Sequence, residues 1–173
     1  MNLVTGSAFD ALFTAFSTSA FRLEARDRYH APEEQERLAR YLAGHGYDAA
    51  SRRATPWWQL IHAATGSGKR VERVRIVTEP HTEYTRYALV GAAVNIDGGE
   101  HVHYLDRVHA RALELPDHDY WLFDDKVVAL MHFGENDMFL GAEIRNEPEV
   151  LVRHRQWKKT AWRYATPYHD YIR

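Results

Sequence analysis

The sequence predicts a single-domain α/β protein with a mixed β-sheet, and two observations support this. Near the N-terminus a strand pattern, a helical region and a second strand pattern follow one another, which favours a parallel strand pair. Further on, the apolar runs "DYWLFD", "KVVALMHF" and "MFLGAEIR" are separated only by short acidic or Gly/Asn turns, as in an antiparallel meander. The length of 173 residues suits one domain with an ordinary core.

The N-terminal region, about residues 1–66, is expected to be mainly helical. "AFRLEARDRY" interrupts it with alternating apolar and charged side chains, which predicts a half-buried strand. Gly44 and Gly66 are expected to end the second and third helices. The three helices are expected to begin near Ser7, Pro32 and Thr55.

The mixed sheet is expected to occupy about residues 70–145. "RVERVRIVTEP" is a strand that ends before Pro80, residues 82–97 have helical spacing, and "HVHYL" is a further strand before the meander. A C-terminal helix is predicted over about residues 148–165. Its apolar stripe consists of Val150, His154, Trp157 and Ala161.

Composition narrows the function classes. Apolar residues make up 45% and charged residues 27% of the chain, as in ordinary globular proteins. A net charge of −2 gives no broad electrostatic surface for nucleic acid or acidic membranes. The chain contains no cysteine, which fits a cytoplasmic location, and no apolar run approaches the ~18 residues of a membrane span.

Neither a phosphate-binding loop nor a histidine metal site is predicted from the sequence. "GSGKR" lacks the spacing of a phosphate-binding loop and lies between a helix and a strand rather than the reverse. His101 and His103 share a strand face, with His109 after them, and His118 and His132 can pair across the meander. Neither set has a further ligand fixed by spacing, so we predict no metal and no cofactor.

A candidate anion site lies where the second strand passes into the following helix. Two arginines on one strand face can hold a phosphate or carboxylate through forked hydrogen bonds, and ligands usually bind at the carboxyl ends of parallel strands. The alternative is that these arginines pair with Glu72 and Glu79. The predicted ligand-binding residues are Arg73, Arg75, Glu79, Tyr84, Arg86 and His118.

The C-terminal helix combines basic and aromatic side chains, which suggests a surface for a protein partner or nucleic acid. The alternative is a solvated helix face with core tryptophans. The acidic balance of the chain argues against direct nucleic-acid binding. The residues predicted for this surface are Arg155, Lys158, Lys159 and Trp162.

Four stretches, "FRLEARDRY", "RVRIVTEP", "LPDHDYWLFDD" and "RHRQWKKTAWRYATPY", resemble an uncharacterised family of small actinobacterial proteins. That family is a domain of unknown function whose members often neighbour genes for helix-turn-helix regulators. The resemblance covers nearly the full chain. It implies a regulatory setting and a helix-turn-helix protein as partner, but no reaction.

The order "AAVNIDGGEHVHYL", "HDYWLFDDKVVALMHF" and a final helix is similar to one half of the phospholipase D fold. In that family a His-x-Lys-x4-Asp signature supplies the nucleophile, an oxyanion clamp and an orienting acid. Here His118 and Asp125 match, but Tyr120 replaces the lysine and supplies no charge. If Asp124 is the acid instead, Asp117 takes the histidine position and the motif is lost.

We therefore predict a non-catalytic binding or regulatory module with a phospholipase D-like fold. It acts with a separate helix-turn-helix regulator and senses a small anionic ligand. The alternative is a phosphodiesterase or nuclease with His118 as nucleophile, together with Tyr120 and Asp125. A third alternative is nucleic-acid binding by the final helix through Lys158 and Lys159.

Overall fold

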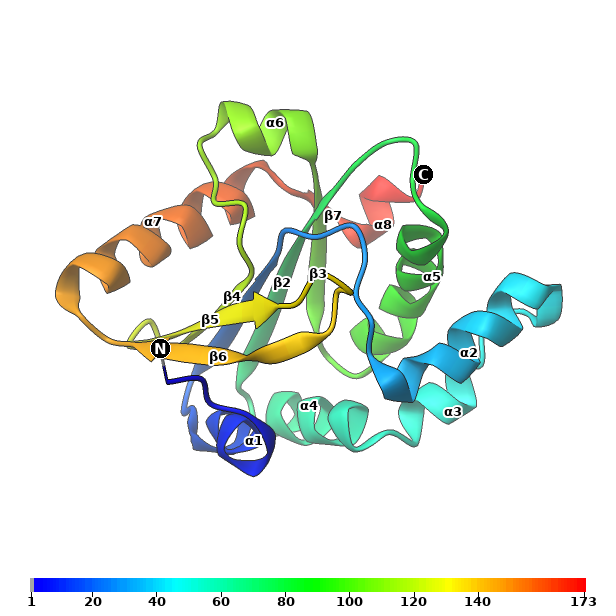
Figure 1. The fold of residues 1–173 in the computed structure, drawn as a ribbon, viewed down its shortest axis with the longest axis horizontal. Coiled ribbons are helices and arrows are strands. Elements are labelled where there is room, and N and C mark those ends of the chain that lie inside the picture. The colour runs from blue at the N-terminus through cyan, green and yellow to red at the C-terminus, as the bar shows by residue number, and fades with distance from the viewer. Residues whose placement is uncertain (1) are drawn as a thin grey trace.

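A computed structural model describes residues 2–173 and shows a seven-stranded mixed sheet covered by helices on both faces (Figure 1). The strand order is β6-β5-β4-β1-β2-β3-β7. The strands are β1 (Ser19–Glu24), β2 (Arg70–Val77), β3 (His101–Asp106), β4 (Tyr120–Phe123), β5 (Val127–Phe133), β6 (Phe139–Arg145) and β7 (Thr166–Pro167). The longer helices are α1 (Gly6–Ala15), α4 (Pro56–Gly66), α5 (Glu83–Asp97) and α7 (Pro148–Tyr164). The short ones are η1 (Pro32–Glu34), α2 (Gln35–Arg40), η2 (Tyr41–His45), α3 (Ala49–Arg53), α6 (Arg107–Ala112) and α8 (Tyr168–Tyr171).

The predicted α/β fold class is confirmed in its main parts. β1 and β2 pair in parallel, as do β2 and β3, while β4, β5 and β6 form the expected antiparallel meander. The side chain of Thr55 accepts a hydrogen bond from the Trp58 N–H and caps α4, as its sequence predicts. The first helix differs, since it begins at Gly6 with Thr5 at its N-cap position, and Ser7 lies inside it.

The central strand β1 is buried on both sides, which corrects the half-buried strand expected from its alternating sequence. Phe21 and Leu23 point to the face covered by α6 and α7, where the largest apolar cluster lies. Arg22 and Glu24 point to the opposite face, on which α1, α4 and α5 pack. We call the face with Phe21 and Leu23 the α7 face, and the face with Arg22 and Glu24 the cavity face.

The segment from η1 to α3 leaves the sheet and extends to one side of the molecule (Figure 1). Its path turns at Gly44 and Gly46, whose φ angles of 86° and 75° suit glycine. The segment contacts the rest of the protein at Tyr47, whose ring lies against the ring of Tyr87 in α5. It therefore forms an arm, residues 32–54, beside the cavity face.

Among residues 2–173, no helix has the length and apolar character that crossing a membrane requires.

Candidate functional site

A cavity of about 720 Å³ lies between the cavity face, the arm and helices α1, α4 and α5. This volume is within the range of small-molecule sites. The charged residues that line it are Asp10, Arg22, Glu24, Glu33, Glu34, Arg37, Arg52, Arg73 and Arg75. Aromatic residues line it too, namely Phe9, Phe13, Tyr29, Tyr47, Trp57, Tyr84, Tyr87 and Trp121.

The floor of the cavity is a cluster of strand charges that the parallel pairing of β1 and β2 creates. Arg22 pairs with Arg73 in the strand register, and Glu24 pairs with Arg75, so all four side chains share one face. Glu24 binds the guanidinium groups of both Arg73 and Arg75. Burial raises the pKa of Glu24, but the neighbouring arginines outweigh it and bring the pKa to about 2.

Asp119 completes one side of this floor from the segment before β4. Its carboxylate accepts hydrogen bonds from Arg22 Nη2 at 2.5 Å, the Tyr29 hydroxyl at 2.7 Å and the Ala25 N–H at 2.9 Å. Burial raises the pKa of Asp119, while Arg22 and Tyr29 oppose that rise. Asp119 therefore fixes Arg22 in place beneath the cavity.

Glu100 completes the other side. Its carboxylate accepts a hydrogen bond from Arg73 Nε at 2.7 Å. Three guanidinium groups, on Arg22, Arg73 and Arg75, thus face the three carboxyl groups of Glu24, Glu100 and Asp119. Such mutual neutralisation is what lets charged groups stay buried.

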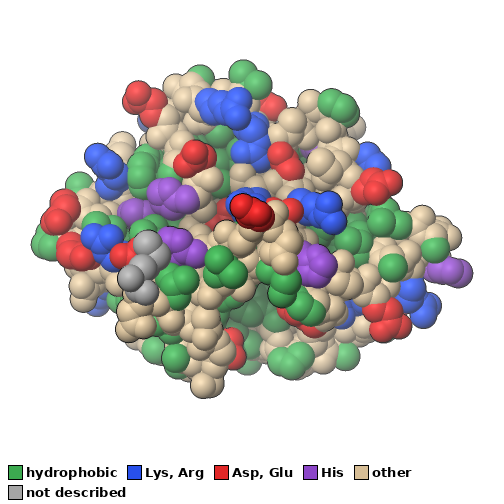
Figure 2. Space-filling model, viewed as in Figure 1, with side chains coloured by type: hydrophobic (Ala, Val, Ile, Leu, Met, Phe, Trp, Pro, Cys, Tyr) green, Lys and Arg blue, Asp and Glu red, His purple; other side chains and the backbone are tan. Residues whose placement is uncertain are grey.

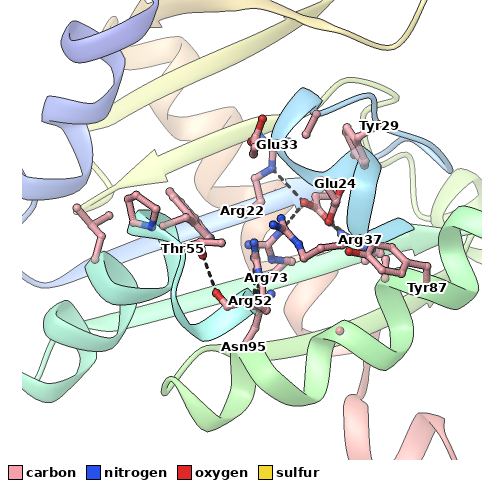
Figure 3. Close-up of a pocket in the computed structure, with 18 of the residues that line it drawn as sticks. Arg22, Glu24, Tyr29, Glu33, Arg37, Arg52, Thr55, Arg73, Tyr87 and Asn95 are labelled. Carbon is pink, nitrogen blue, oxygen red and sulfur yellow. Dashed lines mark hydrogen bonds and ion pairs between the residues drawn. The ribbon is translucent and has the colours of Figure 1, made fainter. Parts of the chain in front are cut away.

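Two more guanidinium groups reach the cavity from the arm, and neither forms an ion pair within residues 2–173. Arg52 donates to the amide oxygen of Asn95 at 3.2 Å, and Nε of Arg37 is buried without a hydrogen-bond partner. Nη1 of Arg22 and the hydroxyl of Tyr87 are also buried and unpartnered. Figure 3 shows these side chains converging from β1, the arm and α5. The cavity is therefore lined by two guanidinium groups that form no ion pair within residues 2–173, together with the carboxylates of Asp10, Glu33 and Glu34.

The structure brings together some of the predicted ligand-binding residues and separates others. Arg73, Arg75 and Tyr84 line the cavity. Glu79 lies outside it and accepts a hydrogen bond from the Tyr171 hydroxyl, while Arg86 donates to the His81 carbonyl.

The alternative expectation, that Arg73 and Arg75 pair with Glu72 and Glu79, is wrong. Glu72 points to the α7 face, because neighbouring strand residues alternate, and it lies 3.9 Å from Lys158 Nζ. The partners of the two arginines are Glu24 and Glu100 instead.

His118 lies on the α7 face and therefore outside the cavity. Its ring contacts those of Tyr120, His154 and Trp157, at centroid distances of 6.2, 5.8 and 5.7 Å. Tyr120 is fully buried, and its hydroxyl donates to the His154 carbonyl at 3.4 Å. Asp125 lies in the β4–β5 turn and binds Lys158 Nζ at 3.0 Å, so it does not join His118.

The predicted partner surface on α7 is only partly available. Lys158 is held between Glu72 and Asp125, and Trp162 stacks on His103 at 3.9 Å. Arg155 and Lys159 are exposed, although Arg155 also donates to the Asp125 carbonyl. The free part of this surface is therefore small.

Sequence reasoning missed the residues that define the site, namely Arg22, Glu24, Arg37, Arg52 and Asp119. Arg22 and Glu24 alternate with apolar residues, which is also the pattern of a strand with one solvated face. The sequence predicts a parallel partner for β1 but not its antiparallel pairing with β4, and this pairing is what makes β1 a central strand with both faces covered.

The fold and the site define a single-domain α/β protein with a charged cavity on one face of a mixed sheet. The sequence over residues 7–173 matches the family described as a domain of unknown function, DUF6879, and the chain belongs to that family. No curated protein matches the sequence.

Among solved structures, the fold is similar to Nuc from Salmonella typhimurium, a phospholipase D family member. The TM-score is 0.51 at 14% sequence identity, over 94% of this chain and 91% of that one. This similarity supports the phospholipase D-like fold that the sequence predicts.

Proposed function

We propose that the protein is a regulatory module that binds a small anionic ligand in the cavity and acts with a separate helix-turn-helix regulator. The observation that carries the proposal is the pair Arg37 and Arg52, which line the cavity and form no ion pair within residues 2–173, Arg52 donating only to the amide oxygen of Asn95. An anionic ligand supplies the missing counter-charge. Such charge-assisted hydrogen bonds are stronger than neutral ones.

The floor arginines take a different role in this proposal. Arg73 and Arg75 are already neutralised by Glu24 and Glu100, so they have little net charge to offer a ligand. Arg22 is the exception, because its buried Nη1 has no acceptor although its Nη2 binds Asp119. Nη1 has almost no surface open to the cavity, so a ligand oxygen reaches it only when neighbouring side chains shift. Such a contact removes the cost of a buried, unpaired donor.

Binding of inorganic phosphate tests whether Arg37 and Arg52 hold an anion in the cavity. Thermal unfolding is measured in phosphate and in chloride at equal ionic strength, for wild type and for Arg37→Gln and Arg52→Gln. Arg40→Gln, an exposed arginine in the same helix as Arg37, is the matched control. A ligand at 100 times its Kd stabilises the fold by about 2.7 kcal/mol.

Each cavity variant is expected to weaken phosphate binding at least tenfold, and Arg40→Gln less than twofold. Equal stabilisation of wild type and both cavity variants by phosphate contradicts an anion site at these residues.

The helix-turn-helix partner rests on the regulatory setting that the sequence resemblance implies. Acidic and basic side chains are interspersed on the face in Figure 2, which supports a protein partner over a nucleic-acid backbone. Co-purification of this protein with a helix-turn-helix protein encoded nearby is the test. Lys159→Glu on α7 is expected to weaken the complex about tenfold, and Lys126→Glu, an exposed lysine of the β4–β5 turn, is the control. Failure to co-purify with or without phosphate contradicts the partnership.

The phosphodiesterase alternative has one observation in its favour. Nε2 of His118 and Nε2 of His154 are both buried without partners, so each ring has an unused nitrogen. The position of the missing lysine, however, holds the uncharged Tyr120, whose hydroxyl is already engaged. Wild type and His118→Ala are compared on bis(p-nitrophenyl) phosphate. We expect no turnover by either, and wild-type turnover that disappears in the variant establishes the alternative.

A further inference from the structure

The cavity has a second end whose chemistry differs from that of its charged floor. Beside Arg22, the lining passes into apolar and aromatic side chains from α1, α4, β4 and β5. The members of this aromatic end are Phe9, Phe13, Trp57, Leu60, Trp121 and Met131. A ligand that fills the cavity therefore touches an apolar wall as well as the guanidinium groups.

The aromatic end is built around Trp57, Trp121 and Phe13. The Phe13 ring meets the two indoles edge-on at 4.8 and 5.0 Å, and the indole centroids lie 5.8 Å apart. Phe13 and Trp121 are buried, but Trp57 is only half-buried while lining the cavity. Trp57 thus presents part of a rigid, flat surface to a ligand, and flat aromatic groups pack best against such a surface.

The charged and aromatic ends meet at Trp121. The guanidinium carbons of Arg22 and Arg73 lie 5.6 and 5.9 Å from the centre of its ring, within cation–π distance. A ligand with a flat ring at one end and an anionic group at the other spans this junction. In such a ligand the ring would lie beside Trp57 and the oxyanion would face the charged end of the cavity.

The cavity has room for a ligand much larger than a simple inorganic anion. Water occupies ~30 Å³ in the liquid, and phosphate displaces only a few waters. A cavity of about 720 Å³ would remain mostly unfilled around it. Cavities of this size bury drug-sized molecules instead.

Resting on the proposed function, we infer that the ligand is an aromatic oxyanion: a flat ring joined to a phosphate or carboxylate. Calorimetry on the full chain uses adenosine 5′-monophosphate and indole-3-acetate as the phosphate and carboxylate probes. Inorganic phosphate and cyclohexaneacetate are the probes without an aromatic ring.

Trp57→Leu keeps an apolar side chain but removes the flat surface. Trp157→Leu, at a half-buried tryptophan on the α7 face, is the matched control. If circular dichroism shows that Trp57→Leu does not fold, Trp57→Met takes its place, since methionine fills irregular space in a core and also has no ring.

At least one aromatic probe is expected to bind wild type at least 100-fold more tightly than inorganic phosphate. Trp57→Leu should weaken that probe at least tenfold and change phosphate binding less than threefold. Which aromatic probe binds more tightly distinguishes a phosphate from a carboxylate ligand.

Two results overturn the inference. If phosphate or cyclohexaneacetate binds as tightly as the aromatic probes, the ring requirement is wrong although the anion site stands. If none of the four probes binds, both the inference and the anion site are wrong.

Discussion

Arg22 and Asp119 meet at 2.5 Å in the floor of the cavity and join the central strand β1 to the segment that enters β4. Both side chains are almost completely buried. They are 97 residues apart in sequence, so this contact ties distant parts of the chain together. Because a buried charge without its partner is strongly unfavourable, the pair is a sensitive point for both stability and binding.

Asp119→Asn is expected to lower the free energy of unfolding by about 3–5 kcal/mol, since it leaves Arg22 buried without its carboxylate. Urea denaturation followed by circular dichroism measures the change. Asp117→Asn, two residues earlier and exposed, is the control and should change stability by less than about 0.5 kcal/mol. Equal stability of the two variants would show that the ion pair is unimportant for the fold.

Asp124 is expected to be the second carboxylate on which the fold depends. It accepts hydrogen bonds from the N–H groups of Ser17, Thr18 and Ser19 at 2.7, 2.7 and 2.9 Å, which fixes the start of β1. Asp124→Asn should cost about 1.5–3 kcal/mol at pH 7, the usual range for hydrogen bonds to charged groups. Asp125→Asn breaks only a partly exposed pair with Lys158 and should cost about 1 kcal/mol or less.

The contribution of Asp124 to the free energy of unfolding is expected to decrease at low pH. Burial raises the pKa of Asp124, but the N–H groups of Ser17, Ser19 and Thr18 outweigh it and lower the pKa below the ordinary value of 3.8. Its stabilisation is therefore complete above pH 3.8 and is lost as the pH falls through the lower, folded-state pKa. The stability difference between wild type and Asp124→Asn should shrink below pH 3.8, and a constant difference down to pH 2 would contradict this.

The sequence predicted those elements whose signals are local. The cap at Thr55, the helical spacing of residues 82–97 and the meander turns each depend on residues close together in the chain. The short helix α6 and the pair β7 and α8 were missed, because so few residues give too short a periodic pattern.

The site was harder to predict because its partners come from distant segments. Arg22 meets Asp119 across 97 residues, and Arg73 meets Glu24 across 49. Alternation in β1 shows only that Arg22 and Glu24 share a face. Whether that face meets solvent or other charges depends on which strands lie beside it. Arg37 and Arg52 reach the cavity only because the arm folds back, which no local pattern indicates.

His154 is expected to make stability depend on pH near neutrality. Its Nδ1 lies 2.8 Å from the Val150 carbonyl, and a carbonyl only accepts, so Nδ1 carries the proton and Nε2 is an unpartnered acceptor. Burial lowers the pKa of His154, and the Val150 hydrogen bond only partly opposes this. Burial also lowers the pKa of His118.

The unfolded chain therefore binds more protons than the folded one below pH 6.5, and stability falls as the pH drops from 6.5 toward the folded-state pKa. His154→Asn keeps a donor for the Val150 carbonyl and removes the titrating ring. The loss of stability between pH 7.5 and 5.5 should be smaller in this variant, as measured by urea denaturation. His169→Asn, at an exposed position, is the control for the loss of one imidazole. If the free energy of unfolding changes equally with pH in wild type, His154→Asn and His169→Asn, the role of His154 is contradicted.

Gly91 is expected to control how the arm closes over the cavity. A Cβ atom at this position of α5 would lie 2.6 Å from the Tyr47 hydroxyl oxygen and 2.9 Å from its ring carbon Cζ, so Tyr47 must move. Alanine in place of glycine favours a helix by about 1 kcal/mol, but overpacking costs about 1–3 kcal/mol. Because Tyr47 lines the cavity from the arm, Gly91→Ala should loosen the arm and weaken ligand binding.

Hydrogen exchange of residues 32–54 and phosphate binding measure the two effects. Gly66→Ala is the control, since nothing lies within 4 Å of a Cβ at the end of α4 and its φ angle is not positive. The control should leave exchange in the arm and phosphate affinity unchanged, while Gly91→Ala raises exchange there and weakens phosphate binding. Unchanged exchange in Gly91→Ala would mean that Tyr47 adjusts in place and that the arm does not depend on this contact.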